Sequence, residues 1–186
     1  MNRKFFIMVT VALVGIAGAG ALSWQYFLQN NTVGVAVELQ PSASQASLGS
    51  EYRVFEHPKL GFSIEYPAEF SAARYEEADN AETILFENKK EGEEKLGFQI
   101  FITPFGEETI TRERILQDLP NAGIEEPQEA ILGDGTHALI FWSNDEAVGK
   151  TREVWFTHGG YLYEVSTYAR LDTWLANILK TWQFER

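Results

Sequence analysis

An uncharged apolar run at the N-terminus decides how the rest of this chain can be organised. Phe5 to Leu22 is eighteen residues without a charge, and the aromatic-rich stretch Trp24 to Leu28 follows almost directly. A membrane-spanning helix needs about 20 apolar residues, whereas the apolar part of a signal peptide usually has about 7–15. Tryptophan and tyrosine favour the headgroup level of a bilayer. We therefore expect Phe5 to Leu28 to cross a membrane once.

The charges before this run predict its orientation. Arg3 and Lys4 precede the apolar residues, and basic residues remain on the cytoplasmic side. The expected location is therefore the cell membrane, single-pass, with the N-terminus in the cytoplasm and the C-terminal domain outside. Ala19-Gly20-Ala21 also fits the small-residue pattern of a signal-peptide cleavage site. In that alternative the domain is secreted after cleavage near Ala21.

A change in composition separates the apolar run from the folded part. Asn30 to Ser50 is rich in Asn, Gln, Ser, Ala, Gly and Val and has too little apolar mass to pack. We divide the chain into an anchor or signal peptide (1–29), a flexible linker (30–50) and an extracytoplasmic domain (51–186).

The charge and the missing cysteines exclude several functions. The chain has 27 acidic and 15 basic residues, a net charge of -12 and no cysteine. Such a surface repels phosphate backbones, so we expect no nucleic-acid partner. Without cysteine, disulfides, a cysteine nucleophile, thiolate zinc sites and lipoprotein acylation are excluded.

Most of the domain alternates as β-strands do. Phe62 to Tyr66 places every second residue on one apolar face before Pro67, and Leu96 to Thr103 does the same before Pro104. Shorter strands are expected at 52–56 and 83–86. The dipeptides Asp134-Gly135 and Gly159-Gly160 each separate two apolar runs, as in hairpins with type I′ turns.

Two segments have helical periodicity. Thr111 can cap a helix whose apolar stripe is Ile115, Leu116 and Leu119, and Pro120 ends it. Leu171 to Trp182 carries apolar residues on one continuous stripe, which must lie on a sheet. The predicted fold class is α+β, with an antiparallel sheet of about six strands flanked by helices.

Two segments resemble PsbP-like domains. The first is His57-Pro58-Lys59-Leu60-Gly61-Phe62-Ser63-Ile64-Glu65-Tyr66-Pro67. The second runs from Gly160 to Thr167 and is followed by a helix ending in Ile178-Leu179-Lys180-Thr181-Trp182-Gln183-Phe184. The resemblance implies a six-stranded antiparallel sheet with flanking helices. The best-known members of that family are accessory proteins of the photosynthetic oxygen-evolving complex, and many bacterial relatives are exported and membrane-tethered. No photosystem-binding residue is matched.

No pattern of catalytic, cofactor-binding or metal-binding residues is present. His57, His137 and His158 do not have helical ligand spacing, and a Gly-x-Ser-x-Gly elbow is missing. The acidic clusters lack the alternating spacing of a calcium loop. We expect no enzyme activity, cofactor or metal.

Aromatic residues gather in the C-terminal hairpins. With a two-residue turn at Gly159-Gly160, Phe156 opposes Tyr163, while Trp155 and Leu162 lie on the other face. If helices cover both faces, these residues are core. If one face is open, Trp155, Leu162 and the neighbouring Tyr161 mark a partner or ligand surface.

The sequence supports two hypotheses on function. The first is a tethered, non-catalytic domain that contacts other membrane or envelope proteins as an accessory or assembly factor. The second is a domain that binds a small apolar ligand between sheet and helix.

Overall fold

The computed structural model describes residues 37–38, 51–88, 96–118, 123–145 and 149–185. The predicted membrane segment Phe5 to Leu28, and the linker apart from residues 37–38, lie outside the described residues. In the part of the chain that is described, no helix is long and apolar enough to cross a membrane.

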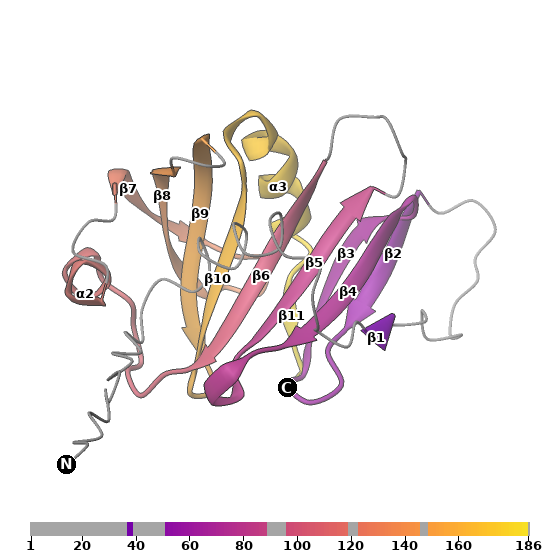
Figure 1. Cartoon of the computed structure of the whole chain (residues 1–186), viewed down its shortest axis with the longest axis horizontal. Helices are drawn as coiled ribbons and strands as arrows, with labels where there is room; N and C mark the ends of the chain where they lie inside the picture. The colour runs from indigo at the N-terminus through magenta and orange to yellow at the C-terminus, as the bar shows by residue number, and fades with distance from the viewer. Residues whose placement is uncertain (1–36, 39–50, 89–95, 119–122, 146–148, 186) are drawn as a thin grey trace, which may run out of the picture.

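The described strands form two antiparallel sheets (Figure 1). The larger sheet has eight strands, in the order β1 (Val37–Glu38), β4 (Phe70–Glu76), β5 (Glu82–Asn88), β6 (Gly97–Pro104), β10 (Tyr161–Tyr168), β9 (Gly149–His158), β8 (His137–Asp145) and β7 (Glu125–Ile131). The smaller sheet has the order β11 (Gln183–Phe184), β3 (Phe62–Pro67) and β2 (Tyr52–Glu56).

The antiparallel α+β prediction is confirmed, but the predicted number of strands, about six, is too low. β4 was not expected, because Phe70 is its only large apolar residue on the buried side and Ala72 and Arg74 complete that face. Such a strand has little hydrophobic periodicity, so it cannot be recognised before its neighbour β5 is placed beside it.

The β9–β10 hairpin has the predicted register. Tyr163 pairs with Phe156, Val165 with Val154 and Glu164 with Trp155. Gly159 and Gly160 have φ values of 59° and 83°, as a type I′ turn requires.

The turn between β7 and β8 differs from the prediction. Only Gly135 has a positive φ, at 94°, so Asp134-Gly135 is not a type I′ turn. The Asp134 side chain instead accepts a hydrogen bond from the Thr136 backbone N–H at 2.9 Å. The loop is therefore closed by an Asp side chain that bonds the backbone two residues later.

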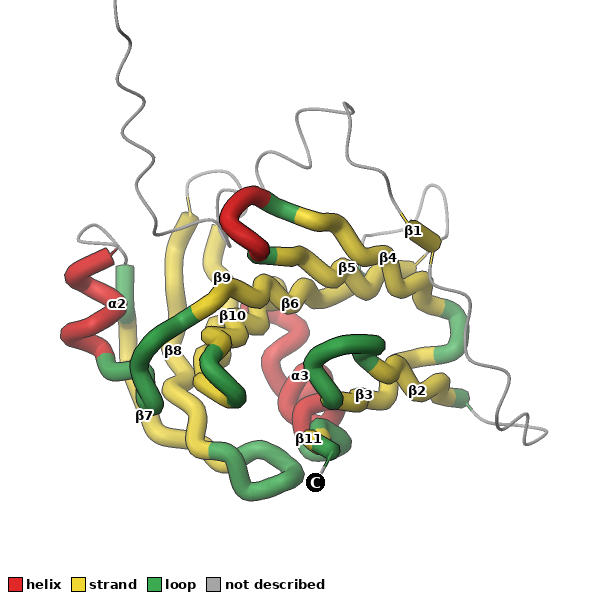
Figure 2. The backbone as a smooth tube through the Cα atoms, turned by 90° about the horizontal axis from the view of Figure 1, so that it is seen from below, coloured by secondary structure: helices red, strands yellow, loops and turns green. Residues whose placement is uncertain are grey.

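The main core lies on the concave face of the larger sheet. It fills the space between that sheet and the layer formed by the smaller sheet and α3 (Asp172–Leu179) (Figure 2). α3 ends three residues before the predicted end of the stripe. Trp182 follows the helix, is 0% exposed and stacks on Phe62 at 4.5 Å between ring centroids. Trp174, on the same predicted stripe, is only half-buried.

A second core lies on the opposite face of the larger sheet, under α2 (Arg112–Asp118). Its buried members are Ile115, Phe141, Trp155 and Leu162. As predicted, the Thr111 hydroxyl caps α2 by accepting the Arg114 N–H at 3.2 Å. Leu119 and Pro120 lie outside the described residues.

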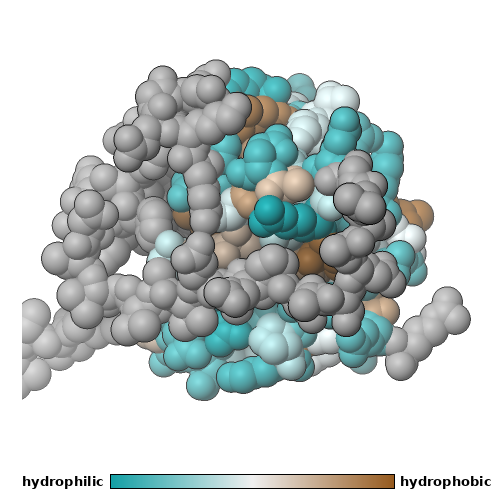
Figure 3. Space-filling model, turned by 90° about the vertical axis from the view of Figure 1, so that its right-hand side faces the viewer, coloured by the Kyte–Doolittle hydropathy of each residue, from teal (hydrophilic) through white to brown (hydrophobic). Residues whose placement is uncertain are grey.

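The described surface is mostly polar. In Figure 3, hydrophilic residues surround isolated hydrophobic ones on the side that faces the viewer. The exposed large hydrophobic residues of the described chain are Tyr52 and Val54 on β2 and Ile131 at the end of β7.

Candidate functional site

The structure separates the three residues predicted as a possible partner or ligand surface. Trp155 and Leu162 are 7% and 5% exposed and belong to the second core under α2. Trp155 and Leu162 would form a partner or ligand surface only if their face of the sheet were open. Because α2 covers that face, they are core residues. Tyr161 is half-buried at the β9–β10 turn and packs against the main core. No common surface is formed by the three.

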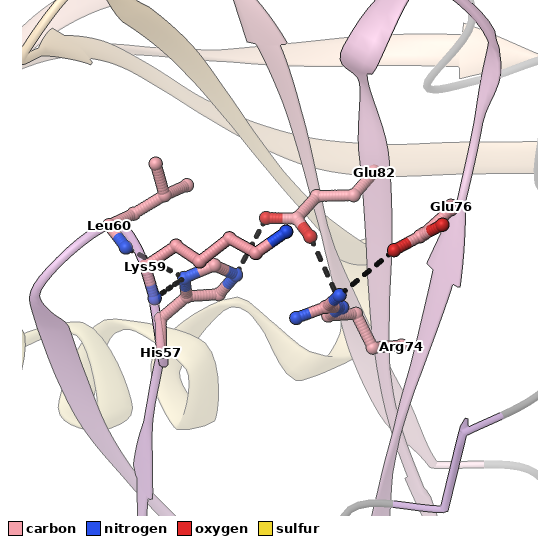
Figure 4. Close-up of polar contacts among 6 residues, drawn as sticks. All are labelled: His57, Lys59, Leu60, Arg74, Glu76 and Glu82. Carbon is pink, nitrogen blue, oxygen red and sulfur yellow. Dashed lines mark hydrogen bonds and ion pairs between the residues drawn. The ribbon is translucent and has the colours of Figure 1, made fainter.

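A buried polar network instead surrounds His57 at the end of β2 (Figure 4). The His57 side chain is 1% exposed, and its Nε2 lies 2.6 Å from Oε1 of Glu82 on β5. The second carboxylate oxygen of Glu82 lies 3.3 Å from Nε of Arg74 on β4, and Arg74 also pairs with Glu76 at 3.2 Å. The residue that follows β2 and two strands of the larger sheet therefore contribute to one chain of polar contacts.

The imidazole of His57 is engaged at both nitrogens. Nδ1 accepts hydrogen bonds from the backbone N–H groups of Lys59, at 3.3 Å, and Leu60, at 3.0 Å. Nδ1 therefore carries no proton, and the ring proton is on Nε2. Within the described residues Nε2 has no aligned hydrogen-bond acceptor, so its close contact with Glu82 is electrostatic.

This arrangement suits structural support better than chemistry. A general base must present a free lone pair within hydrogen-bond reach of its substrate. The only basic nitrogen of His57 already accepts two backbone N–H groups and lies inside the protein. Arg74 compensates the charge of Glu82, as a poorly solvated carboxylate requires.

Glu82 also affects the main core. It pairs with Ile102, which in turn pairs with Tyr163 on the next strand, so all three lie on the concave face. Burial raises the pKa of the Tyr163 hydroxyl, and the nearby Glu82 and Tyr161 raise it further. The phenol therefore stays neutral in the folded protein at ordinary pH.

The histidines do not meet. His137 and His158 are exposed, and the His158 ring stacks on Phe184 at 3.5 Å. Among the described residues, no three His, Asp or Glu side chains are grouped so that they could hold a metal ion.

From the sequence, His57 was considered only as one of three histidines without helical ligand spacing, and its partners were missed. Glu82 is 25 positions away and Arg74 is on a strand that was not predicted. The available signal was the period of two in each strand: Arg74 is on the same face as Phe70 and Ala72, and Glu82 is on the same face as Ile84 and Phe86. A charged residue on a buried face needs a partner.

The sequence matches no family model and no curated protein. One similar solved structure is the solution structure of cyanobacterial PsbP (CyanoP) from Synechocystis sp. PCC 6803. It covers 78% of this chain and 100% of its own, with a TM-score of 0.52 and 11% identity. At that identity the likeness concerns the fold alone. The chain therefore has a PsbP-like fold, as the two sequence segments predicted.

Proposed function

We propose that this chain is an exported, membrane-tethered, non-catalytic domain that acts through protein contacts, as an accessory or assembly factor. The observation that carries the proposal is the combination of the uncharged run Phe5 to Leu28 with a PsbP-like domain behind a short linker. The tether would restrict the domain to partners in or near the membrane.

The geometry around His57 supports a non-catalytic role. Its two nitrogens face Glu82 and the backbone of the following turn, and the side chain is shielded from solvent. Arg74 is bound on both sides by carboxylates. These groups pair with one another or with the backbone, whereas a catalytic constellation leaves groups that converge on a substrate.

The packing of the main core disfavours the alternative of an apolar-ligand domain. Between the larger sheet and the α3 layer, Trp182 stacks on Phe62 at 4.5 Å and Phe156 stacks on Tyr163 at 5.0 Å. The largest side chains of the domain therefore fill the space in which such a ligand was expected.

The topology can be tested with protease and intact spheroplasts of a bacterium that expresses the full chain. We expect protease to digest residues 51–186 or to release them from the linker, because the basic residues before Phe5 keep only the N-terminus inside. Uncut product should sediment with the membrane. A domain that resists protease until the membrane is broken would show that the orientation is wrong.

Protein contact can be tested by photo-cross-linking in the same cells. Of the predicted surface residues, Tyr161 is the one that α2 does not cover, so a photoreactive residue is placed there. Gln128, exposed on the far edge strand β7, provides the control position. We expect an adduct with an envelope protein from position 161 that is lost when residues 1–29 are replaced by a cleavable signal peptide. Recovery of the uncross-linked chain alone from both positions would oppose the proposal.

A further inference from the structure

The hydrogen bonds at His57 require one protonation state. Nδ1 faces two donors, the N–H groups of Lys59 and Leu60. A second proton on the ring would sit on Nδ1 and turn the acceptor into a donor, so both bonds would be lost. An imidazole in water takes up this proton near about pH 6.5. The turn after β2 is thus built on the neutral form of His57.

This turn also holds the C-terminus of the domain. The N–H of Glu185 donates to the carbonyl oxygen of Gly61 at 2.7 Å, and Phe184 on β11 pairs with Phe62 on β3. Phe184 packs against the main core. A turn that loses its two bonds to His57 would therefore also loosen β11.

Several charged or titratable groups face the ring from the elements around it. Glu82 on β5 favours the protonated ring. Arg74 on β4, which shares that carboxylate, opposes it, as does Lys59, whose side chain runs beside the imidazole (Figure 4). Tyr163 on β10 is neutral, and Phe62 on β3 stacks on the ring at 5.2 Å. Protonation would thus strengthen the contact with Glu82 while removing the support of the turn.

We propose that His57 is an acid-sensitive latch: its protonation releases the turn 58–61 and frees the C-terminal strand β11. The physiological use of such a latch rests on the proposed export, because a domain outside the cytoplasm experiences the ambient pH. The latch itself is a property of the folded chain.

The test is amide hydrogen exchange of the purified full chain in detergent, corrected for the intrinsic pH dependence of exchange. We expect protection of the amides of Lys59 and Leu60, and of residues 183–185, to fall about tenfold or more from pH 7.5 to pH 5. Bonded amides open when their acceptor is lost. Nitrogen chemical shifts of the His57 ring, measured in the unaltered chain, should show a bare Nδ1 at pH 7.5.

Two variants identify the responsible histidine. In His57→Asn the amide oxygen can replace Nδ1 as acceptor but does not titrate, so protection should become independent of pH. His158→Asn is the matched control, because His158 stacks on Phe184 and could itself loosen β11 in acid. This variant should behave as the unaltered chain does.

The proposal is overturned if His57 carries a proton on Nδ1 at pH 7.5, if protection does not fall down to pH 5, or if His57→Asn loses protection as the unaltered chain does. The first two measurements need no substitution, so they decide the matter even if His57→Asn fails to fold. A failed protease experiment on spheroplasts would remove the proposed export but leave these results unchanged.

Discussion

The two faces of the larger sheet are covered in different ways. On the concave face, α3 and the smaller sheet cover a continuous aromatic core that includes Trp182 and Phe62, both at most 1% exposed. On the opposite face, the seven-residue α2 covers a second cluster, to which it contributes Ile115. Both clusters use residues of the same strands, because neighbouring side chains alternate between faces. Whether a side chain is buried therefore depends on the elements that pack on its face of the sheet. We expect the layer of α3 and the smaller sheet to contribute more to stability than α2 does.

The largest effect is expected for Trp182→Ala. The indole is 0% exposed and contacts Phe62 and Phe156 at 4.5 and 5.0 Å. Its removal should cost about 3–5 kcal/mol, a large part of the roughly 5–15 kcal/mol typical of a domain. Urea unfolding followed by circular dichroism measures the loss. Trp182→Phe keeps a ring on Phe62 and should lose clearly less, so equal losses would argue against a stacking role.

Leu162→Ala tests the thinner cover. Leu162 is 5% exposed beneath α2, so truncation should cost about 2–3 kcal/mol, in the lower part of the range for buried leucine. Hydrogen exchange should rise in residues 112–118 before it rises in α3. Leu139→Ala, half-buried on the same face, is the control and should cost less. Loss of protection in α3 first would show that the two faces are not separable.

Thr111→Ala removes the cap of α2 while leaving both cores filled. The Thr111 hydroxyl accepts the Arg114 N–H, and a lost cap costs about 1 kcal/mol. The midpoint of urea unfolding should decrease accordingly. Thr173→Ala, exposed on α3, should change it by less. Equal shifts of the midpoint in the two variants would show that the Thr111 hydroxyl does not stabilise α2.

Tyr163→Phe should have its main effect in alkali. The pKa of Tyr163 is raised in the folded state, so above about pH 10 the unfolded chain loses a proton that the folded chain retains. The contribution of Tyr163 to the free energy of unfolding is therefore complete below about pH 10 and is lost as the pH rises. Tyr163→Phe should reduce the fall in unfolding free energy between about pH 10 and 11. An unchanged pH dependence would show that other groups cause it.

Much of the fold could be predicted from local patterns. The alternation of 62–66 and the two glycines at 159–160 specify strands, a turn and the register of β9 with β10, because these depend on residues close in the chain. The register across the turn at 159–160 also predicted that Trp155 and Leu162 share one face. The register does not show whether that face is covered, and only the position of α2 decided this.

By itself, the sequence determined the fold class, the cap of α2, the charge and the absence of cysteine, all of which follow from local or compositional rules. Trp174 and Trp182 were equivalent on a predicted stripe, yet α3 ends at Leu179 and only Trp182 is fully buried. The contact between His57, Glu82 and Arg74 likewise joins the end of a strand in the smaller sheet to two strands of the larger sheet. Tertiary structure decided these features, because long-range packing sets which side chains lose water and which charges must find a partner.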